Sequence, residues 1–351
     1  MSAPAERLRE RIRSSGPLPF AVFMEEALYG EGGYYRRDAL PIGEHGDYVT
    51  GSSLSPLFGR AMGRLLRRLD SELGRAAELF EAGYGGGAHL GAVVEFLAGE
   101  GEGRRLRAWD RVARPVPAGV ERVASLDEIG EGEIHGLVFS YELFDALLVH
   151  RLIGRADGSL GELWVDLDPE GRFAWREGEL SDPSSLPALL GDASLAPGQI
   201  ADLSPEWAPL YGALARRLGR GLLVTCDYGF PRDRLLDPRV RRHGTLACYR
   251  RQTVHRDPFA DVGAQDLTAH VDFTALIEAG EAAGLSTFAL TRQALWLSAC
   301  GLFEDLADAP AATRQEAIAL LDGEGMGEEI RVLVQARGVE PERVLDARFF
   351  P

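Results

Sequence analysis

The feature that most constrains the fold of this chain is a cluster of glycines between two apolar segments of different spacing. Residues 77–80 are Ala-Glu-Leu-Phe, which is typical of a short buried strand. Glycine occupies positions 83, 85, 86 and 87, and residues 88–97 then carry apolar side chains at helical spacing. The pattern predicts a strand, a tight turn and a helix, the unit that brings backbone close to a nucleotide-like ligand. An ordinary strand-to-helix turn is the alternative.

An acidic residue just before the glycines indicates which ligand the turn would take. Glu81 precedes Gly83, Gly85 and Gly87 in the pattern Glu-x-Gly-x-Gly-x-Gly. A dinucleotide fingerprint would bring a pyrophosphate to this turn, and the Glu81 carboxylate would repel it. S-adenosyl-L-methionine carries an amino group and a sulfonium but no phosphate. The pattern therefore favours S-adenosyl-L-methionine over NAD as the cofactor.

Two further segments extend the prediction to a parallel sheet. Residues 106–110 form a second predicted strand that ends in Asp110, whose carboxylate would hold ribose hydroxyls. Residues 120–125 form a third, followed by Leu126 and Asp127, which we assign to the same cofactor site. The succession is typical of a class I methyltransferase core, an α/β fold with a Rossmann-like sheet.

Acids also follow the fourth and fifth predicted strands. Residues 134–140 lead into Glu142 and Asp145, and the very apolar segment 221–226 ends in Asp227. Ligands of open parallel sheets bind beyond the carboxyl ends of the strands, so these three acids are the candidate catalytic residues. If Glu142 opens a helical turn, the side chains of Glu142 and Asp145 share one face. The alternative is that both acids only stabilise a helix N-terminus.

The order of the segments predicts two regions. Residues 1–75 form an N-terminal helical region that covers the cofactor edge of the sheet, and residues 76–351 form the methyltransferase core. Alternating residues separated by glycine turns predict an antiparallel β insertion in the core around 149–180. A loop and helical substrate region follows around 230–300, and residues 328–336 are predicted as a helix.

Composition excludes several classes of protein. The net charge of −16 argues against a nucleic-acid partner, because phosphate binding needs clustered basic surface. The 3 cysteines lie far apart without metal-ligand spacing, so no metal site is predicted. No apolar run is long enough to span a membrane, and the polar N-terminus lacks the apolar core of a signal peptide. All 38 basic side chains are arginine, as in GC-rich genomes, and we expect a bacterial cytoplasmic protein.

Several stretches together resemble the MidA-type class I methyltransferases, whose mitochondrial members are arginine methyltransferases that assist respiratory complex I assembly. The matching stretches span most of the chain and occur in the order of the family: residues 46–50, 81–87, 142–150, 227–229, 244–250 and 266–273. The resemblance implies a Rossmann-like methyltransferase sheet, S-adenosyl-L-methionine as cofactor and an arginine of a partner protein as the methyl acceptor. It also adds Asp47 and Thr50 to the cofactor site.

The chain departs from the pattern of this family at a few positions. Ser52 and Ser53 replace a Pro-Glu pair, Tyr141 replaces an asparagine, and Tyr84 replaces the proline of the glycine turn. A second hypothesis therefore stays open, in which the protein binds the cofactor but acts in assembly or interaction with reduced or lost turnover. A third, an NAD-dependent dehydrogenase, conflicts with Glu81.

Overall fold

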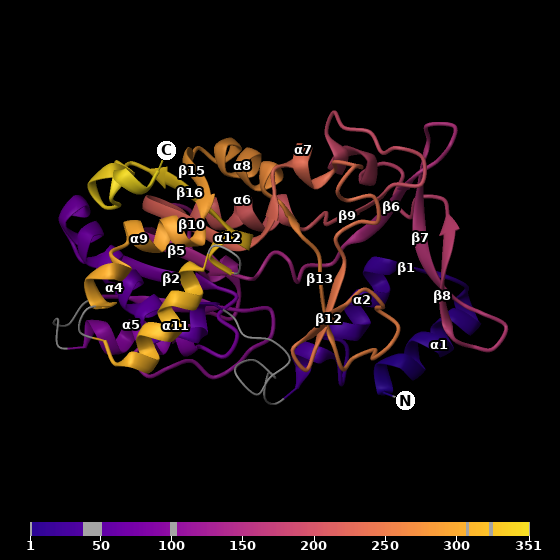
Figure 1. The fold of residues 1–351 in the computed structure, drawn as a ribbon, viewed down its shortest axis with the longest axis horizontal. Coiled ribbons are helices and arrows are strands. Elements are labelled where there is room, and N and C mark those ends of the chain that lie inside the picture. Colours follow the sequence, from indigo (N-terminus) through magenta and orange to yellow (C-terminus); the bar gives the residue numbers. More distant parts are fainter. Residues whose placement is uncertain (1, 38–50, 99–103, 307–308, 323–325, 351) are drawn as a thin grey trace. The chain divides into compact units, whose positions relative to one another are not determined.

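The computed structural model describes residues 2–37, 51–98, 104–306, 309–322 and 326–350. The chain forms two compact units, each built from three separate segments (Figure 1). Unit 1 contains Met1–Tyr48, Phe144–Trp207 and Gly229–Ala275, and unit 2 contains Val49–Leu143, Ala208–Tyr228 and Leu276–Pro351. The expected division at residue 75, with a helical region over the cofactor edge, stays a prediction.

Unit 2 holds the predicted parallel sheet. Its strands are ordered β15-β16-β10-β5-β2-β3-β4, and β10, β5, β2, β3 and β4 run parallel to one another. Their bounds are Glu78–Ala82 (β2), Leu106–Trp109 (β3), Glu121–Arg122 (β4), Ile134–Tyr141 (β5), Leu218–Phe230 (β10), Ser286–Arg292 (β15) and Ile330–Arg337 (β16). All five predicted core strands form, so the parallel core of the sequence-based fold is confirmed.

The helix predicted for residues 328–336 is wrong. Only Met326–Glu329 is helical (α12), and Ile330–Arg337 forms strand β16, which pairs antiparallel with both β10 and β15. Ile330, Val332 and Val334 are fully buried there. A run rich in β-branched residues with a strand on either side gains more from sheet pairing than from an isolated helix.

Helices supply the rest of the core of unit 2. The longest is α4, which begins after Ser55, whose hydroxyl accepts a hydrogen bond from the Leu57 amide at 3.3 Å, and ends at Gly74 in the left-handed conformation. The helices are Gly51–Leu54 (α3), Pro56–Leu73 (α4), Ala88–Leu97 (α5), Gln293–Ala299 (α9), Leu302–Leu306 (α10) and Ala311–Leu321 (α11), with α6 (Trp207–Arg217) and α8 (Phe273–Ala282) beginning in unit 1. Short 3₁₀ turns are Leu126–Glu128 (η2), Pro341–Arg343 (η4) and Ala347–Phe349 (η5).

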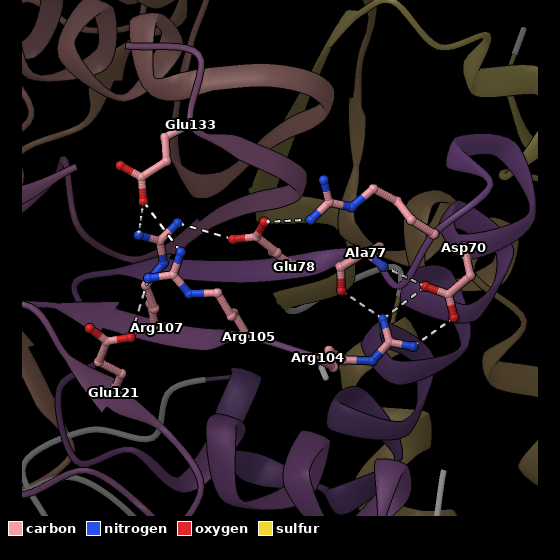
Figure 2. Close-up of polar contacts among 9 residues, drawn as sticks. Asp70, Ala77, Glu78, Arg104, Arg105, Arg107, Glu121 and Glu133 are labelled. Atoms are coloured by element: carbon pink, nitrogen blue, oxygen red, sulfur yellow. Dashed lines mark hydrogen bonds and ion pairs between the residues drawn. The ribbon is translucent and has the colours of Figure 1, made fainter. Parts of the chain in front are cut away.

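A network of ion pairs ties together the starting ends of the parallel strands (Figure 2). Arg107 of β3 is 2% exposed and contacts Glu78 of β2 at 3.1 Å and Glu133, just before β5, at 2.6 Å. Arg104 donates two hydrogen bonds, of 2.9 and 2.6 Å, to the carboxylate of Asp70 in α4. Removing one partner of a buried pair such as Arg107–Glu78 typically costs about 3–5 kcal/mol of stability, so this end of the sheet is structural.

Unit 1 contains the predicted antiparallel insertion, which is confirmed, together with strands that the sequence did not reveal. One sheet is ordered β1-β7-β6-β9, with β8 pairing β7, and a second is ordered β12-β11-β13. The strands are Leu18–Pro19 (β1), His150–Gly154 (β6), Leu160–Leu167 (β7), Phe173–Gly178 (β8), Ile200–Leu203 (β9), Ala247–Arg250 (β11), Thr253–His255 (β12), Asp266–Thr268 (β13) and Val271–Asp272 (β14). The helices are Ala3–Ser15 (α1), Phe20–Tyr29 (α2) and Arg232–Leu235 (α7), with 3₁₀ turns Tyr34–Arg36 (η1) and Leu186–Leu190 (η3).

In neither unit does a described helix combine the length and the apolar character that crossing a membrane requires.

Candidate functional site

The glycine turn between β2 and α5 has the geometry that its sequence predicts. Gly83, Gly85 and Gly87 have φ values of 76°, 52° and 72°, in the region that side chains rarely adopt. The Gly83 amide donates to the Trp109 carbonyl at 2.7 Å, which ties the turn to the end of β3. Helix α5 begins immediately afterwards without a side-chain N-cap, so its first amides are directed to the space before the helix.

Asp110 lies against this turn, and its contact with ribose hydroxyls stays a prediction. Its Oδ2 accepts a hydrogen bond from the Gly85 amide at 2.9 Å, and its Oδ1 accepts one from Val112 at 3.0 Å. Burial raises the pKa of the carboxyl, and these two backbone donors lower it in part. The carboxylate therefore shapes the turn, and the second lone pair on each oxygen can still accept a hydroxyl.

Two side-chain contacts at this site could not be predicted from the sequence. The Tyr84 hydroxyl accepts from the Arg114 amide at 2.9 Å and donates to the Arg114 carbonyl at 2.5 Å. His89, the second residue of α5, lies with its Nδ1 at 2.8 Å from Oε2 of Glu81. Because the partners are 30 and 8 residues apart, no local spacing rule could have found either contact.

Glu142 lies at the carboxyl end of β5, in a strained backbone conformation. Its φ is 47°, its amide donates to the Cys226 carbonyl at 2.9 Å, and the next amide, of Leu143, donates to Oδ2 of Asp227 at 3.2 Å. The condition under which the side chains of Glu142 and Asp145 would share one helical face is not met, because the positive φ ends the strand without starting a right-handed helix. Non-glycine residues in such conformations concentrate at functional sites.

Leu143 connects this turn to the glycine turn. A Cβ added to Gly83 would lie 2.8 Å from Cδ1 of Leu143, so the backbone at Gly83 packs directly against it. The structure thus brings the carboxyl ends of β2, β3 and β5 close to one another, with Glu81, Asp110 and Glu142 near them, and Leu143 also contacts Asp227 within β10.

Asp227 does not lie at a strand tip, because β10 continues to Phe230. Its side chain is fully buried, and its Oδ1 accepts from the Tyr228 amide at 2.9 Å. Asp145 belongs to unit 1, is 6% exposed, and its carbonyl accepts from Ala269 at 3.0 Å.

The other predicted cofactor residues are not brought to the glycine turn by any contact that the structure records. Leu126 and Asp127 form part of η2 and contact Arg217, through the Leu126 carbonyl at 2.6 Å and the Asp127 carboxylate at 3.1 Å. Asp47 and Thr50 lie outside the described residues. The cofactor roles of all four stay predictions.

The composition of the site fits S-adenosyl-L-methionine. Glu81 and Asp110 place carboxylates beside a turn that exposes backbone, which suits a cationic ligand with ribose hydroxyls and no phosphate. Gly86 is exposed, and a Cβ added there would meet nothing within 4 Å. Fold and site together define a class I methyltransferase type of α/β protein.

The comparisons with known proteins agree. Residues 89–291 match the family described as "Putative S-adenosyl-L-methionine-dependent methyltransferase". The match covers more than half of the chain, and the protein belongs to this family. The predicted activity class and cofactor, an S-adenosyl-L-methionine-dependent methyltransferase, are thereby confirmed, and the dehydrogenase hypothesis is not supported.

Solved and curated relatives extend the similarity. A Burkholderia thailandensis protein bound to S-adenosyl-homocysteine is 29% identical, with a TM-score of 0.86 over 96% of this chain and 92% of that one. The mitochondrial protein arginine methyltransferase NDUFAF7 homolog of Drosophila melanogaster is 26% identical over 327 residues, covering 80% of this chain and 70% of the relative. Human mitochondrial protein arginine methyltransferase NDUFAF7 is 24% identical, covering 77% and 67%. The matches span about two thirds of these curated relatives.

Proposed function

We propose that this methyltransferase modifies an arginine of a partner protein. The observation that carries the proposal is Glu142, whose strained backbone is held at the carboxyl end of β5 beside the glycine turn. The similarity to curated protein arginine methyltransferases supports the same acceptor. Because family members that the chain resembles assist respiratory complex I assembly, a complex I subunit is the first acceptor to test.

The acceptor sets a chemical demand that carboxylates meet. An arginine guanidinium stays protonated at cellular pH, so one nitrogen must be steered and must lose a proton as it attacks. A carboxylate orients the guanidinium through paired hydrogen bonds and can accept the proton. When bound, S-adenosyl-L-methionine supplies a methyl group already activated by a sulfonium, so the chain's main contribution is orientation. We assign the contacts with the guanidinium to Glu142 and Asp145.

Asp227 takes a different part in the proposal. Its buried oxygens accept hydrogen bonds from the amides of Leu143 and Tyr228, so we propose that it supports the Glu142 turn and does not accept the proton. We also propose a protein partner rather than nucleic acid, and a bacterial cytoplasmic location. Three free, buried cysteines are consistent with a reducing compartment.

Acid–base function of the carboxylates is tested by Glu142→Gln and Asp145→Asn. We expect both variants to bind S-adenosyl-homocysteine as the parent does. Methyl transfer to an arginine-containing acceptor should fall at least ~100-fold, the lower end for losing a positioned acid–base group, which is about 2.7 kcal/mol of barrier. Single-turnover rates at saturating cofactor are the measurement. Transfer at the parent rate in both variants would assign the acceptor to other residues.

The second candidate function is an assembly protein without turnover, and the observation that favours it is Tyr141. Its hydroxyl donates to Oε1 of Gln293 at 2.6 Å, and the ring is buried directly before Glu142, where the family has asparagine. The enzyme and assembly hypotheses are separated by incubating the protein with radiolabelled S-adenosyl-L-methionine and lysate from a strain that lacks this protein. Labelled methylarginine supports the enzyme, whereas cofactor binding without any labelled product supports the assembly protein.

A further inference from the structure

The Glu81 carboxylate contacts the imidazole of His89, and both side chains are almost fully buried. The Nδ1–Oε2 distance is 2.8 Å, and the side chains are 4% and 3% exposed for Glu81 and His89. Glu81 pairs in register with Ala108 on one side and Phe139 on the other, so its backbone is fixed by the sheet. Among the residues that the structure describes, His89 is therefore the side chain that orients the Glu81 carboxylate.

The surroundings of the imidazole identify which nitrogen carries the proton. The ring lies 5.2 Å from the Phe58 ring and 5.1 Å from the Phe139 ring, measured between centroids. Its Nε2 is buried and finds no hydrogen-bond partner among the residues that the structure describes. A hydrogen on Nε2 would be buried without an acceptor in the described part of the chain, which is costly. The proton therefore belongs on Nδ1, where it is donated to Glu81.

An uncharged donor has a particular consequence for ligand binding. An arginine or lysine in place of His89 would orient the carboxylate and also cancel its charge. An imidazole with one ring proton orients the carboxylate and leaves its negative charge in place. A buried, uncompensated carboxylate attracts a cationic group more strongly than one in water does.

We propose that His89 is a positioning residue for the cofactor: it holds the Glu81 carboxylate in one orientation, with its charge available to a cationic group of S-adenosyl-L-methionine. The inference rests on the expectation that Glu81 contacts the cofactor, and not on the identity of the methyl acceptor. Fixing the rotamer before binding removes an ordering cost that the ligand would otherwise meet.

Two substitutions separate positioning from packing. His89→Asn keeps an N–H donor close to the position of Nδ1, whereas His89→Leu fills the aromatic surroundings without a donor. We expect His89→Leu to raise the dissociation constant of S-adenosyl-homocysteine about tenfold, as for loss of one hydrogen bond to a charged group. His89→Asn should stay within about threefold of the parent. Isothermal titration of the full chain measures both, and melting temperatures without ligand report packing separately.

A double-mutant cycle with Glu81→Gln supplies the decisive readout. In the Glu81→Gln background, His89→Leu should raise the dissociation constant of S-adenosyl-homocysteine by less than about twofold, because the carboxylate that His89 orients is gone. The proposal is overturned if the effects of His89→Leu and Glu81→Gln on the binding free energy are fully additive. It is also overturned if His89→Leu lowers the melting temperature but leaves the dissociation constant unchanged. Parent-like affinity of Glu81→Gln overturns it as well. If binding follows the expected pattern but no arginine is methylated, the proposed acceptor fails and the role of His89 stands.

Discussion

The backbone amide of Leu143 donates a hydrogen bond of 3.2 Å to the carboxylate of Asp227. Asp227 is fully buried and lies three residues before the end of β10. Leu143 follows Glu142, the residue with a positive φ just after β5. The bond stabilises a backbone conformation that a glutamate would otherwise avoid. The relationship makes Asp227 a support for Glu142 and leads to the first prediction.

Asparagine and leucine at position 227 should behave differently. Asp227→Asn keeps one oxygen that can accept from Leu143, so we expect methyl transfer within about tenfold of the parent. Asp227→Leu leaves the partly buried Leu143 amide without this acceptor, a loss of ~1–3 kcal/mol, and transfer should fall by about 100-fold. Rates with saturating cofactor are compared with those of Glu142→Gln. If Asp227→Asn is as slow as Glu142→Gln, Asp227 acts on the proton itself.

The strained backbone at Glu142 predicts a difference in stability between two variants that both lack the carboxylate. Glycine adopts a φ of 47° without steric cost, and alanine does not. Glu142→Gly should therefore be more stable than Glu142→Ala by about 1 kcal/mol, although both lack the carboxylate and should be equally inactive. Denaturant unfolding of the two variants measures the difference. Equal stability would mean that the left-handed conformation carries no strain.

The glycine turn predicts two opposite results for neighbouring positions. Valine at position 85 cannot adopt a φ of 52° without clashes, so Gly85→Val should abolish the thermal shift with S-adenosyl-homocysteine. Gly86→Ala is the matched control, because a methyl group there meets nothing within 4 Å and the φ of this glycine is not positive. Its melting temperature and its shift should match the parent. A shift with NAD, absent with S-adenosyl-homocysteine, would contradict the cofactor assignment.

His270 in unit 1 predicts a dependence of stability on pH. Burial, and then Arg241 and Arg256, lower the pKa of this imidazole from 6.5 to about 4, against the opposing effect of Asp202. The unfolded chain therefore binds a proton that the folded chain does not. The stabilising contribution is complete above pH 6.5 and is lost as the pH falls towards about 4.

Replacing His270 tests this assignment. His270→Gln keeps a polar side chain without a group that titrates in this range, so the variant should lose the part of the slope that belongs to His270. The slope due to one proton approaches ~1.4 kcal/mol per pH unit. Urea midpoints at several pH values between 4 and 7 measure it. A slope unchanged by the substitution would assign the pH dependence to other groups.

The local elements of the site could be predicted from the sequence because their causes are local. The glycines at 83, 85 and 87 adopt the positive φ values that only glycine accepts readily, and the helix at Ala88–Leu97 has the expected bounds. Strands β2, β3 and β5 are short apolar runs with an acid at or just after the end, and β2 pairs parallel with both β3 and β5.

Elements whose conformation depends on distant partners could not be predicted in the same way. Residues 330–337 form a strand because β10 and β15 lie on either side of them, and β10 extends to Phe230 because β14 pairs with its last residues. In isolation the same residues are compatible with a helix or a loop. The pairing energy that decides between the conformations comes from segments about 40 to more than 100 residues away.

The sequence alone determined the class of this protein, because a strand, a glycine turn and the acids near the strand ends are encoded by neighbouring residues. Tertiary structure alone decided how the acids are used. Glu81 is oriented by His89, Asp110 is bound by the Gly85 amide, and Asp227 supports the turn at Glu142. Each role depends on which donor approaches the carboxylate within hydrogen-bond distance, and only the packing of separate segments brings that donor there.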